Sequence, residues 1–203
     1  MNTALRTIVL SVALTALCGC AAFQRSIEEQ DPKDAETLSA RYDQNDMLKW
    51  GDMIAGDIIG HYFIKSAESR PLIADLGIQN RTKEHLDMQS LADTITTRLL
   101  DSGRVRLVNT ADRDKLLKEQ GYQLANCTMA TRSAIGKQLG AKYMMTGALI
   151  EMSQEQGREV RVSKKKNVYY QLTINITDLE TGEIVMKKQR DRLRMESKPI
   201  IGW

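Results

Sequence analysis

Two regular spacings of apolar residues run through the chain, and the wider one predicts amphipathic helices. Across Asp46–Phe63 the apolar positions recur with a period of about 3.6 residues. They are Met47, Trp50, Ile54 and Ile58, with Met53 and Phe63 beside them. A second stripe of this kind consists of Met88, Leu91, Ile95 and Leu99. Gly103 follows it at the place where a glycine commonly ends a helix.

Two more helices are predicted in the middle of the chain. The first covers Thr110–Lys118, with Thr110 as its N-cap. The second covers Met129–Leu139 and stops at Gly140. The stretch between them, Gly121–Thr128, is expected to form a loop.

The narrower spacing, an alternation of apolar and polar residues, predicts strands. Two early strands are expected in Pro71–Asn80 and Val105–Val108. Later strands are expected in Ala141–Met152, Val168–Leu179 and Glu183–Arg194, with a tight turn at Thr181-Gly182 before the last. In the second of these later strands one face is apolar and consists of Val168, Tyr170, Leu172, Ile174 and Ile176. The other face is polar and consists of Tyr169, Gln171, Thr173, Asn175 and Thr177.

This order of elements predicts an α+β fold with a single mixed, largely antiparallel sheet and helices packed on it. We place one globular domain at residues 46–203 and find no internal repeat. The basic run Lys164-Lys165-Lys166 falls at a predicted hairpin tip, where it is either a solvated turn or a contact for an acidic surface or lipid headgroups. The tail from Glu196 to Trp203 is expected to follow the last strand.

The N-terminus has the layout of a secretory signal that ends in a lipobox. Arg6 precedes the apolar run Thr7–Leu17, which is much shorter than the roughly 20 residues that span a bilayer. The run ends in Leu17-Cys18-Gly19-Cys20, which matches the bacterial lipoprotein pattern of Leu, two small residues and Cys. Residues 1–19 are therefore predicted to be removed, and Cys20 to carry a diacylglycerol and an N-acyl chain. The alternative is an ordinary cleaved signal in which both cysteines are merely small residues.

A lipid on Cys20 bears on location and on the remaining cysteine. Ala21 follows Cys20 in place of the Asp that resembles an inner-membrane retention signal, so we expect anchoring at the periplasmic face of the outer membrane. Two or more acyl chains hold a protein stably at a bilayer. Cys127 is then the one cysteine left in the mature domain, expected as a small buried hydrophobe in preference to a nucleophile.

Residues 20–45 are polar, lack an apolar period and are interpreted as a flexible tether. Fully extended, these residues reach at most about 90 Å. As a random coil they typically span about 30 Å. The tether is therefore short for a chain held at one membrane that must meet a partner held at another.

Composition and motifs argue against catalysis and against nucleic-acid binding. The 29 basic and 26 acidic residues are interspersed, whereas a nucleic-acid binder concentrates a basic excess on one element. The two histidines, His61 and His85, have no partner at metal-ligand spacing, and no phosphate-loop, nucleophile-elbow or Cys-x-x-Cys motif is present. We expect neither catalytic residues nor a metal, and no cofactor other than the covalent lipid.

Four segments carry a family resemblance, in order and with matching spacing. They are "IQNRTKEHLD", "LLDSGRVRLV", "RSAIGKQLGAKYMMTG" and "LTINITDLETGEIV". With the lipobox and tether before them, they resemble the LpoB-type penicillin-binding protein activators, a family of outer-membrane lipoproteins. The resemblance implies a non-enzymatic domain that docks on a bifunctional class A penicillin-binding protein and stimulates peptidoglycan synthesis. It also implies a fold similar to the N-terminal domain of TolB and to the curli-secretion lipoprotein domain.

The resemblance points to four residues as partner contacts. Asn80 and Thr82, at the end of the first strand, either shape the following turn or touch the partner. Arg81 between them presents a guanidinium fork suited to a carboxylate. Tyr143 is either a core aromatic or an anchor on an exposed sheet face. The chain departs from the family in its tether, which lacks the long Pro-rich composition of some relatives.

Two functions of different kinds are compatible with these observations. The first is a monomeric activator of a class A penicillin-binding protein. The second is an envelope component that acts in secretion or appendage assembly through oligomerisation, since the implied fold also serves such roles.

Overall fold

The computed structural model describes residues 29, 31–32, 37, 39–121, 123, 126–156 and 163–199. Contacts divide the chain into two units after Asp31, and the helices and strands described here belong to the second unit, Pro32–Trp203. The predicted signal peptide and lipidation site Cys20 lie outside the described residues.

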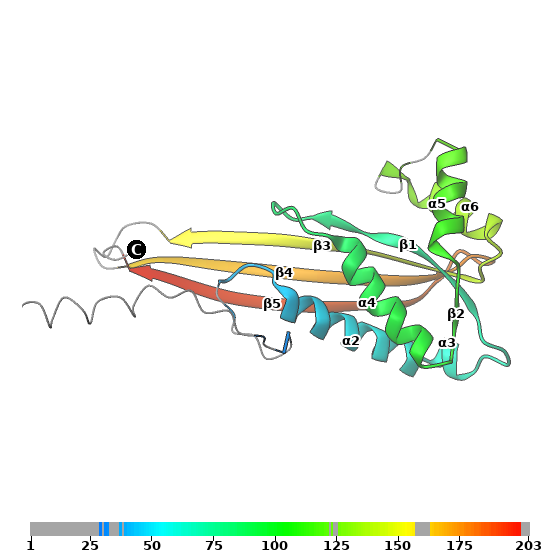
Figure 1. Ribbon diagram of the computed structural model, residues 1–203, viewed down its shortest axis with the longest axis horizontal. Coiled ribbons are helices and arrows are strands. Elements are labelled where there is room, and N and C mark those ends of the chain that lie inside the picture. Colours follow the sequence, from blue (N-terminus) through cyan, green and yellow to red (C-terminus); the bar gives the residue numbers. More distant parts are fainter. Residues whose placement is uncertain are drawn as a thin grey trace, which may run out of the picture. The chain divides into compact units, whose positions relative to one another are not determined.

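The strands form one mixed five-stranded sheet in the order β2-β1-β3-β4-β5 (Figure 1). Their bounds are β1 Leu72–Arg81, β2 Arg106–Leu107, β3 Tyr143–Gln156, β4 Ser163–Asp178 and β5 Ile184–Pro199. β1 pairs in parallel with β2 and β3, whereas β3, β4 and β5 form an antiparallel meander that contains the longest ladders. The predicted α+β class with one mixed, largely antiparallel sheet is confirmed.

The described helices are α2 Gln44–Gly60, α3 Tyr62–Lys65, α4 Met88–Asp101, α5 Thr110–Glu119 and α6 Met129–Gln138. The single helix predicted over Asp46–Phe63 is interrupted at His61, whose extended backbone ends α2 and begins α3. The prediction of Thr110 as an N-cap is wrong by one residue, because the Asn109 side chain accepts the hydrogen bond from the Ala111 backbone N–H at 3.0 Å. Gly103 has a φ of 66° just after α4, as expected of a helix-ending glycine.

The sheet separates two apolar clusters that lie on its opposite faces. On the inner face, Met145 and Leu149 of β3 pack with α2 and α4. On the outer face, Met144 packs with residues of α5 and α6. Successive strand residues point to opposite faces, so neighbours Met144 and Met145 belong to different clusters. The predicted apolar face of β4 is confirmed, since its members Val168, Tyr170, Leu172, Ile174 and Ile176 are at most 1% exposed.

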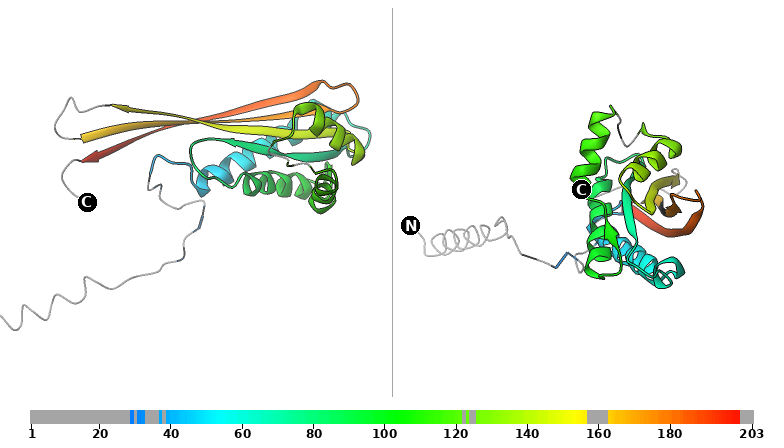
Figure 2. Two further views of the ribbon diagram at one scale, coloured as in Figure 1. Left: turned by 90° about the horizontal axis from the view of Figure 1, so that it is seen from above. Right: turned by 90° about the vertical axis from the view of Figure 1, so that its right-hand side faces the viewer.

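The three meander strands are longer than the sequence predicted, and they extend past the helices (Figure 2). Lys164-Lys165-Lys166 was expected at a hairpin tip but lies inside β4, where Lys165 pairs with Gln156 and Lys166 with Glu155. β5 likewise includes Glu196, which was expected in the tail. The alternation rule misses these ends because residues on both faces are polar there, whereas backbone pairing needs no apolar side chain.

Candidate functional site

The outer face of the sheet is covered at one end and bare at the other. Near α6, Thr146 of β3 is 3% exposed, whereas Met152, six residues further along the same face, is 57% exposed. We call the bare part the open sheet face. It consists of the outward side chains Ile150, Met152, Tyr169, Gln171, Asp191, Leu193 and Met195. It is contributed by three strands that are far longer than the helices that pack on them (Figure 1).

Large apolar side chains on the open sheet face lie in water. Met152, Tyr169 and Leu193 are opposite one another in the β3–β4–β5 register and form one row across the sheet. Leu193 is 66% exposed, and Met195, two positions along β5, is 65% exposed. A contiguous exposed apolar patch next to an aromatic residue is typical of a protein–protein contact surface.

A hydrogen-bond network fixes the polar side chains beside this row. Asp191 Oδ1 accepts from the Tyr169 hydroxyl at 2.8 Å, from Gln171 Nε2 at 3.1 Å and from Gln189 Nε2 at 3.1 Å. The Tyr169 hydrogen bond, followed by those of the two glutamines, lowers the pKa of the Asp191 carboxyl. The same bond raises the pKa of the Tyr169 phenol. The network ties the Tyr169 hydroxyl of β4 to the Asp191 carboxylate of β5.

Two of the sequence-predicted residues, Asn80 and Thr82, build the turn after β1. Asn80 Nδ2 donates to the Glu84 carbonyl at 2.8 Å, and Asn80 Oδ1 accepts from the Thr82 backbone N–H at 3.0 Å. The Thr82 hydroxyl adds a bond to Asn80 Oδ1 at 2.7 Å. Of the two roles considered for these residues, the structure shows turn shaping.

Arg81 lies at the border of the open sheet face. It is exposed, and its Cα is opposite Ile150 in the β1–β3 register. Within the described part of the chain its guanidinium forms no ion pair. Among the four predicted contacts, Arg81 is the one that the structure leaves available to a partner beside the apolar row.

Tyr143 has the position of a core aromatic. It is 7% exposed and meets Phe63 edge-on, with 4.9 Å between ring centroids. Lys142 Nζ lies 5.5 Å from the centroid of the same ring. The alternative of an anchor on an exposed sheet face does not describe this ring, so Tyr143 is not carried forward as a partner contact.

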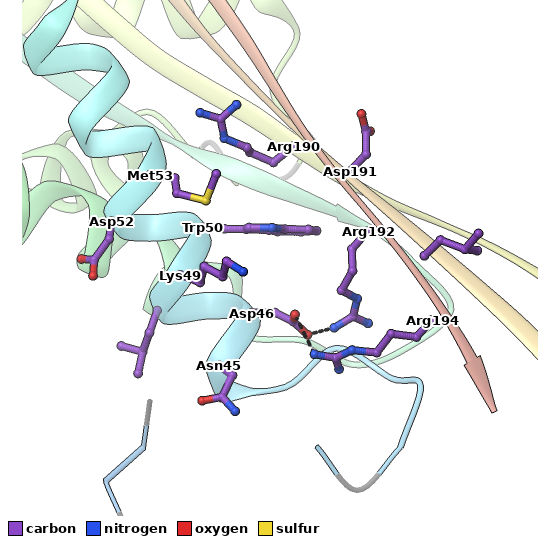
Figure 3. A pocket seen from close by; sticks show the side chains of 12 residues that line it. Asn45, Asp46, Lys49, Trp50, Asp52, Met53, Arg190, Asp191, Arg192 and Arg194 are labelled. Carbon is purple, nitrogen blue, oxygen red and sulfur yellow. Dashed lines mark hydrogen bonds and ion pairs between the residues drawn. The ribbon is translucent and has the colours of Figure 1, made fainter. Parts of the chain in front are cut away.

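A hollow lies between α2 and β5. Its lining is strongly charged on both sides, with Asp46, Lys49 and Asp52 on α2 and Arg190, Asp191, Arg192 and Arg194 on β5 (Figure 3). Trp50 and Met53 supply apolar surface from α2, and Trp50 is itself buried.

The arginines of this hollow are engaged by carboxylates of the same chain. Arg190 pairs with Asp57, and Arg192 pairs with Asp46. Arg194 contacts Asp43 at 2.7 Å and Asp46 at 3.1 Å. Burial, and next the charge of Arg194, lower the pKa of Arg192 to about 10. These pairs leave little charge for a ligand, so we assign the hollow a structural role.

The same arginines hold the chain segment that enters α2. Arg192 Nη2 donates to the Ala40 carbonyl at 3.0 Å, and Arg194 Nη1 donates to the Arg41 carbonyl at 3.1 Å. Ala40 is buried, and the Tyr42 ring packs against Trp50. Residues predicted to belong to the tether therefore contact β5. We call this set of contacts the arginine clamp, made by Arg192 and Arg194 with Asp43, Asp46 and the Ala40 and Arg41 carbonyls.

The described residues show no metal-binding cluster of His, Cys, Asp and Glu. No helix in the described part of the chain has the length and hydropathy needed to cross a bilayer. Cys127 is half-buried, and its thiol contacts the Gln123 carbonyl at 3.3 Å. His61 lies between α2 and α3, as the C-cap of the first and the N-cap of the second.

The apolar members of the open sheet face were missed by sequence reasoning. The sequence of β5 held a signal, because Leu193 and Met195 alternate with Arg192, Arg194 and Glu196. Because alternation is normally interpreted with the apolar side toward the core, this strand gave no reason to place Leu193 in water. The arginine side chains point inward here, toward Asp46 and Asp57 of α2 and its N-cap Asp43.

A family of known proteins matches most of the chain. The family model described as "Peptidoglycan-synthase activator LpoB" matches residues 36–191. The search of curated proteins gives no significant match.

Solved structures of LpoB domains share the fold. The C-terminal domain from Escherichia coli has 16% identity and a TM-score of 0.54, over 72% of this chain and 98% of that one. The Salmonella enterica C-terminal domain has 14% identity and a TM-score of 0.52, over 69% and 93%. An NMR structure of E. coli LpoB has 16% identity and a TM-score of 0.52, over 85% and 79%.

Proposed function

Because the chain belongs to the LpoB family of peptidoglycan-synthase activators, we propose that it docks through its open sheet face on a bifunctional class A penicillin-binding protein and raises that enzyme's rate. The chain is not itself an enzyme, since its family regulates one. The catalytic groups belong to the synthase, and this chain contributes a binding surface.

The observation that carries the proposal is the exposed row Met152–Tyr169–Leu193 on a sheet face that no described helix covers. Aromatic residues and Met are enriched at the centres of protein interfaces, where a few buried side chains supply most of the binding energy. The network around Asp191 orders Tyr169 in advance. Ordering side chains before binding lowers the entropy cost of docking.

Activation requires more than tight binding. A ligand shifts an equilibrium between two states of its partner only when it binds one state better than the other. The open sheet face must therefore fit the active arrangement of the synthase better than the resting one. A tenfold preference corresponds to about 1.4 kcal/mol, which loss of one well-buried contact can remove.

The location proposed for the chain is based on its N-terminus. A lipid on Cys20 anchors the chain at the periplasmic face of the outer membrane, and Ala21 favours that membrane over the inner one. Since the arginine clamp binds the Ala40 and Arg41 carbonyls, the tether is at most residues 20–39, which reach about 70 Å when extended. A partner anchored in the inner membrane must therefore extend part of the way through the cell wall.

The test is a glycan polymerisation assay with the full-length lipoprotein in detergent and the purified class A penicillin-binding protein of the same bacterium. We expect the wild-type chain to raise the polymerisation rate and Leu193→Glu to lose most of this effect. Leu100→Glu is the matched control, since Leu100 is an exposed leucine of α4 and outside the open sheet face. No stimulation by saturating wild-type protein would refute the proposal.

Sedimentation separates this function from assembly through oligomerisation. An activator that docks one to one is expected to sediment as a monomer, because its open sheet face is kept for the synthase. A stable ring with the open sheet face buried between copies would favour assembly and remove the surface on which the proposal depends.

A further inference from the structure

At the border of the open sheet face there is a pocket with the chemistry of an anion site. Its floor is the outer face of β1, β3 and β4, and its wall is the start of α6. The lining residues are Gln79, Arg81, Cys127, Met129, Arg132, Thr146, Gly147, Ala148, Ile150, Gln171, Thr173 and Asn175. The pocket forms where α6 stops covering the sheet, with a volume of about 460 Å³, at the small end of the range for ligand pockets.

The charge of this lining is one-sided. Among the described lining residues there are two arginines and no carboxylate. Arg132 of α6 is 3% exposed, and burial lowers the pKa of its guanidinium. Asp75, the carboxylate whose charge acts on Arg132, also pairs with Arg113 at 3.2 Å. Arg81 adds a second, exposed guanidinium at the rim.

The floor of the pocket also holds polar atoms that lack partners. Among the described residues the Thr146 hydroxyl, on a residue 3% exposed, has no hydrogen-bond partner, and neither has Asn175 Oδ1. The two residues are opposite each other in the β3–β4 register. Buried polar atoms are nearly always hydrogen-bonded in folded proteins. The Thr146 hydroxyl can donate to an acceptor that arrives from outside, whereas Asn175 Oδ1 is itself an acceptor and adds no support for an incoming carboxylate.

The pocket is continuous with the open sheet face. Ile150 and Gln171 belong to both, and the outward positions Arg81, Ile150, Gln171 and Asp191 form one row across the sheet. A partner that covers the apolar row Met152–Tyr169–Leu193 therefore lies one row away from the pocket. The group that enters the pocket is most simply a side chain of that same partner.

We infer that this pocket receives an acidic side chain of the synthase, whose carboxylate lies between Arg81 and Arg132 and accepts a hydrogen bond from Thr146. This inference rests on the proposed function and adds the chemistry of the partner at its docking surface. Arginine presents two parallel N–H donors that match a carboxylate. Apolar contacts at Leu193 then supply most of the affinity, and the pocket fixes the orientation of the complex and speeds association.

The experiment compares the affinity of full-length variants in detergent for the purified class A penicillin-binding protein. We expect Arg81→Glu to weaken binding about tenfold or more. Thr146→Val is expected to weaken binding about threefold while leaving the fold as stable as wild type, because the lost hydroxyl has no hydrogen-bond partner among the described residues. Arg104→Glu, at an exposed arginine outside the pocket, is the control and is expected to bind like wild type.

The outcomes separate the two proposals. If wild type binds and activates the synthase while Arg81→Glu and Thr146→Val keep its affinity, the acidic side chain is refuted and the proposed function remains. If wild type does not bind the synthase, the proposed function fails and this inference fails with it. Binding of purified muropeptides that Arg81→Glu weakens would assign the pocket to the carboxylates of the cell wall, against the inference.

Discussion

Tyr169 donates its hydroxyl proton to Oδ1 of Asp191 over 2.8 Å, from β4 to the neighbouring strand β5. The bond runs diagonally, since Tyr169 is opposite Leu193 and Asp191 is opposite Gln171. It places an oriented ring between Met152 and Leu193, which are both exposed. The free chain therefore already holds the arrangement with which we propose it meets the synthase.

This bond makes a pH-dependent prediction. Hydrogen bonding lowers the pKa of Asp191 in the folded state, so its stabilising contribution is present above the unfolded value of about 3.9 and is lost as the pH falls through the folded pKa. Tyr169→Phe removes the largest cause and is expected to move the pKa toward the usual value. NMR titration of the Asp191 carboxyl measures this. An unchanged pKa in Tyr169→Phe would contradict the described network.

Neighbouring residues at the end of β1 have different roles: Asn80 stabilises the turn, and Arg81 is proposed to contact the partner. Asn80→Ala breaks the bonds to the Glu84 carbonyl and the Thr82 backbone N–H, so we expect the free energy of unfolding to fall by about 1 kcal/mol. Arg81→Ala removes an exposed side chain that forms no ion pair with the described residues, and it is expected to leave stability unchanged but to weaken synthase binding. Urea denaturation and a binding assay on both variants check this. Equal loss of stability in the two would overturn the division of roles.

The arginine clamp predicts that removing the Asp46 carboxylate lowers the free energy of unfolding strongly. Asp46 is 5% exposed, belongs to the capping box of α2 and pairs with Arg192 and Arg194. Asp46→Ala leaves two partly buried guanidinium groups without this partner, and we expect a loss of about 3–5 kcal/mol. The control is Asp52→Ala, which breaks the exposed pair with Arg98 and is expected to cost about 1 kcal/mol or less. Thermal or urea unfolding that gives similar losses for both would contradict the clamp.

Gly147 of β3 lies where no side chain fits. A Cβ there would be 2.6 Å from Ile174 Cδ1 and 2.8 Å from the Thr173 carbonyl oxygen. Because the backbone oxygen cannot move aside easily, Gly147→Ala is expected to destabilise by about 1–3 kcal/mol. Gly56 of α2 has nothing within 4 Å of its Cβ position, so Gly56→Ala is expected to stabilise by about 0.5–1 kcal/mol. Opposite signs of the two changes in unfolding free energy are the expected result.

Sequence-based prediction succeeded where burial of one face imposes a regular spacing of apolar residues. The alternation through Val168–Ile176 gave the buried face of β4, and the helix stripes gave α2 and α4. It failed where backbone pairing continues without burial. The ends of β3, β4 and β5 have polar residues on both faces, and Lys164–Lys166 therefore looked like a turn.

The open sheet face was harder to predict, because it is the part of the outer face on which no described helix packs. Arg81 was found from the family resemblance. Leu193 and Met195 were missed, since nothing local shows that α5 and α6 cover only one end of the outer face. Thr146 and Arg132 are distant in sequence and meet only after α6 packs on the sheet.

The most direct test of the central claim is photo-crosslinking in the cell from two leucine positions. A photoreactive amino acid replaces Leu193 on the open sheet face in one strain and Leu100 on α4 in the other, both exposed. We expect mass spectrometry to identify a class A penicillin-binding protein among the adducts from position 193 and not from position 100. A synthase captured equally from both positions, or only copies of this chain captured from position 193, would contradict docking through the open sheet face.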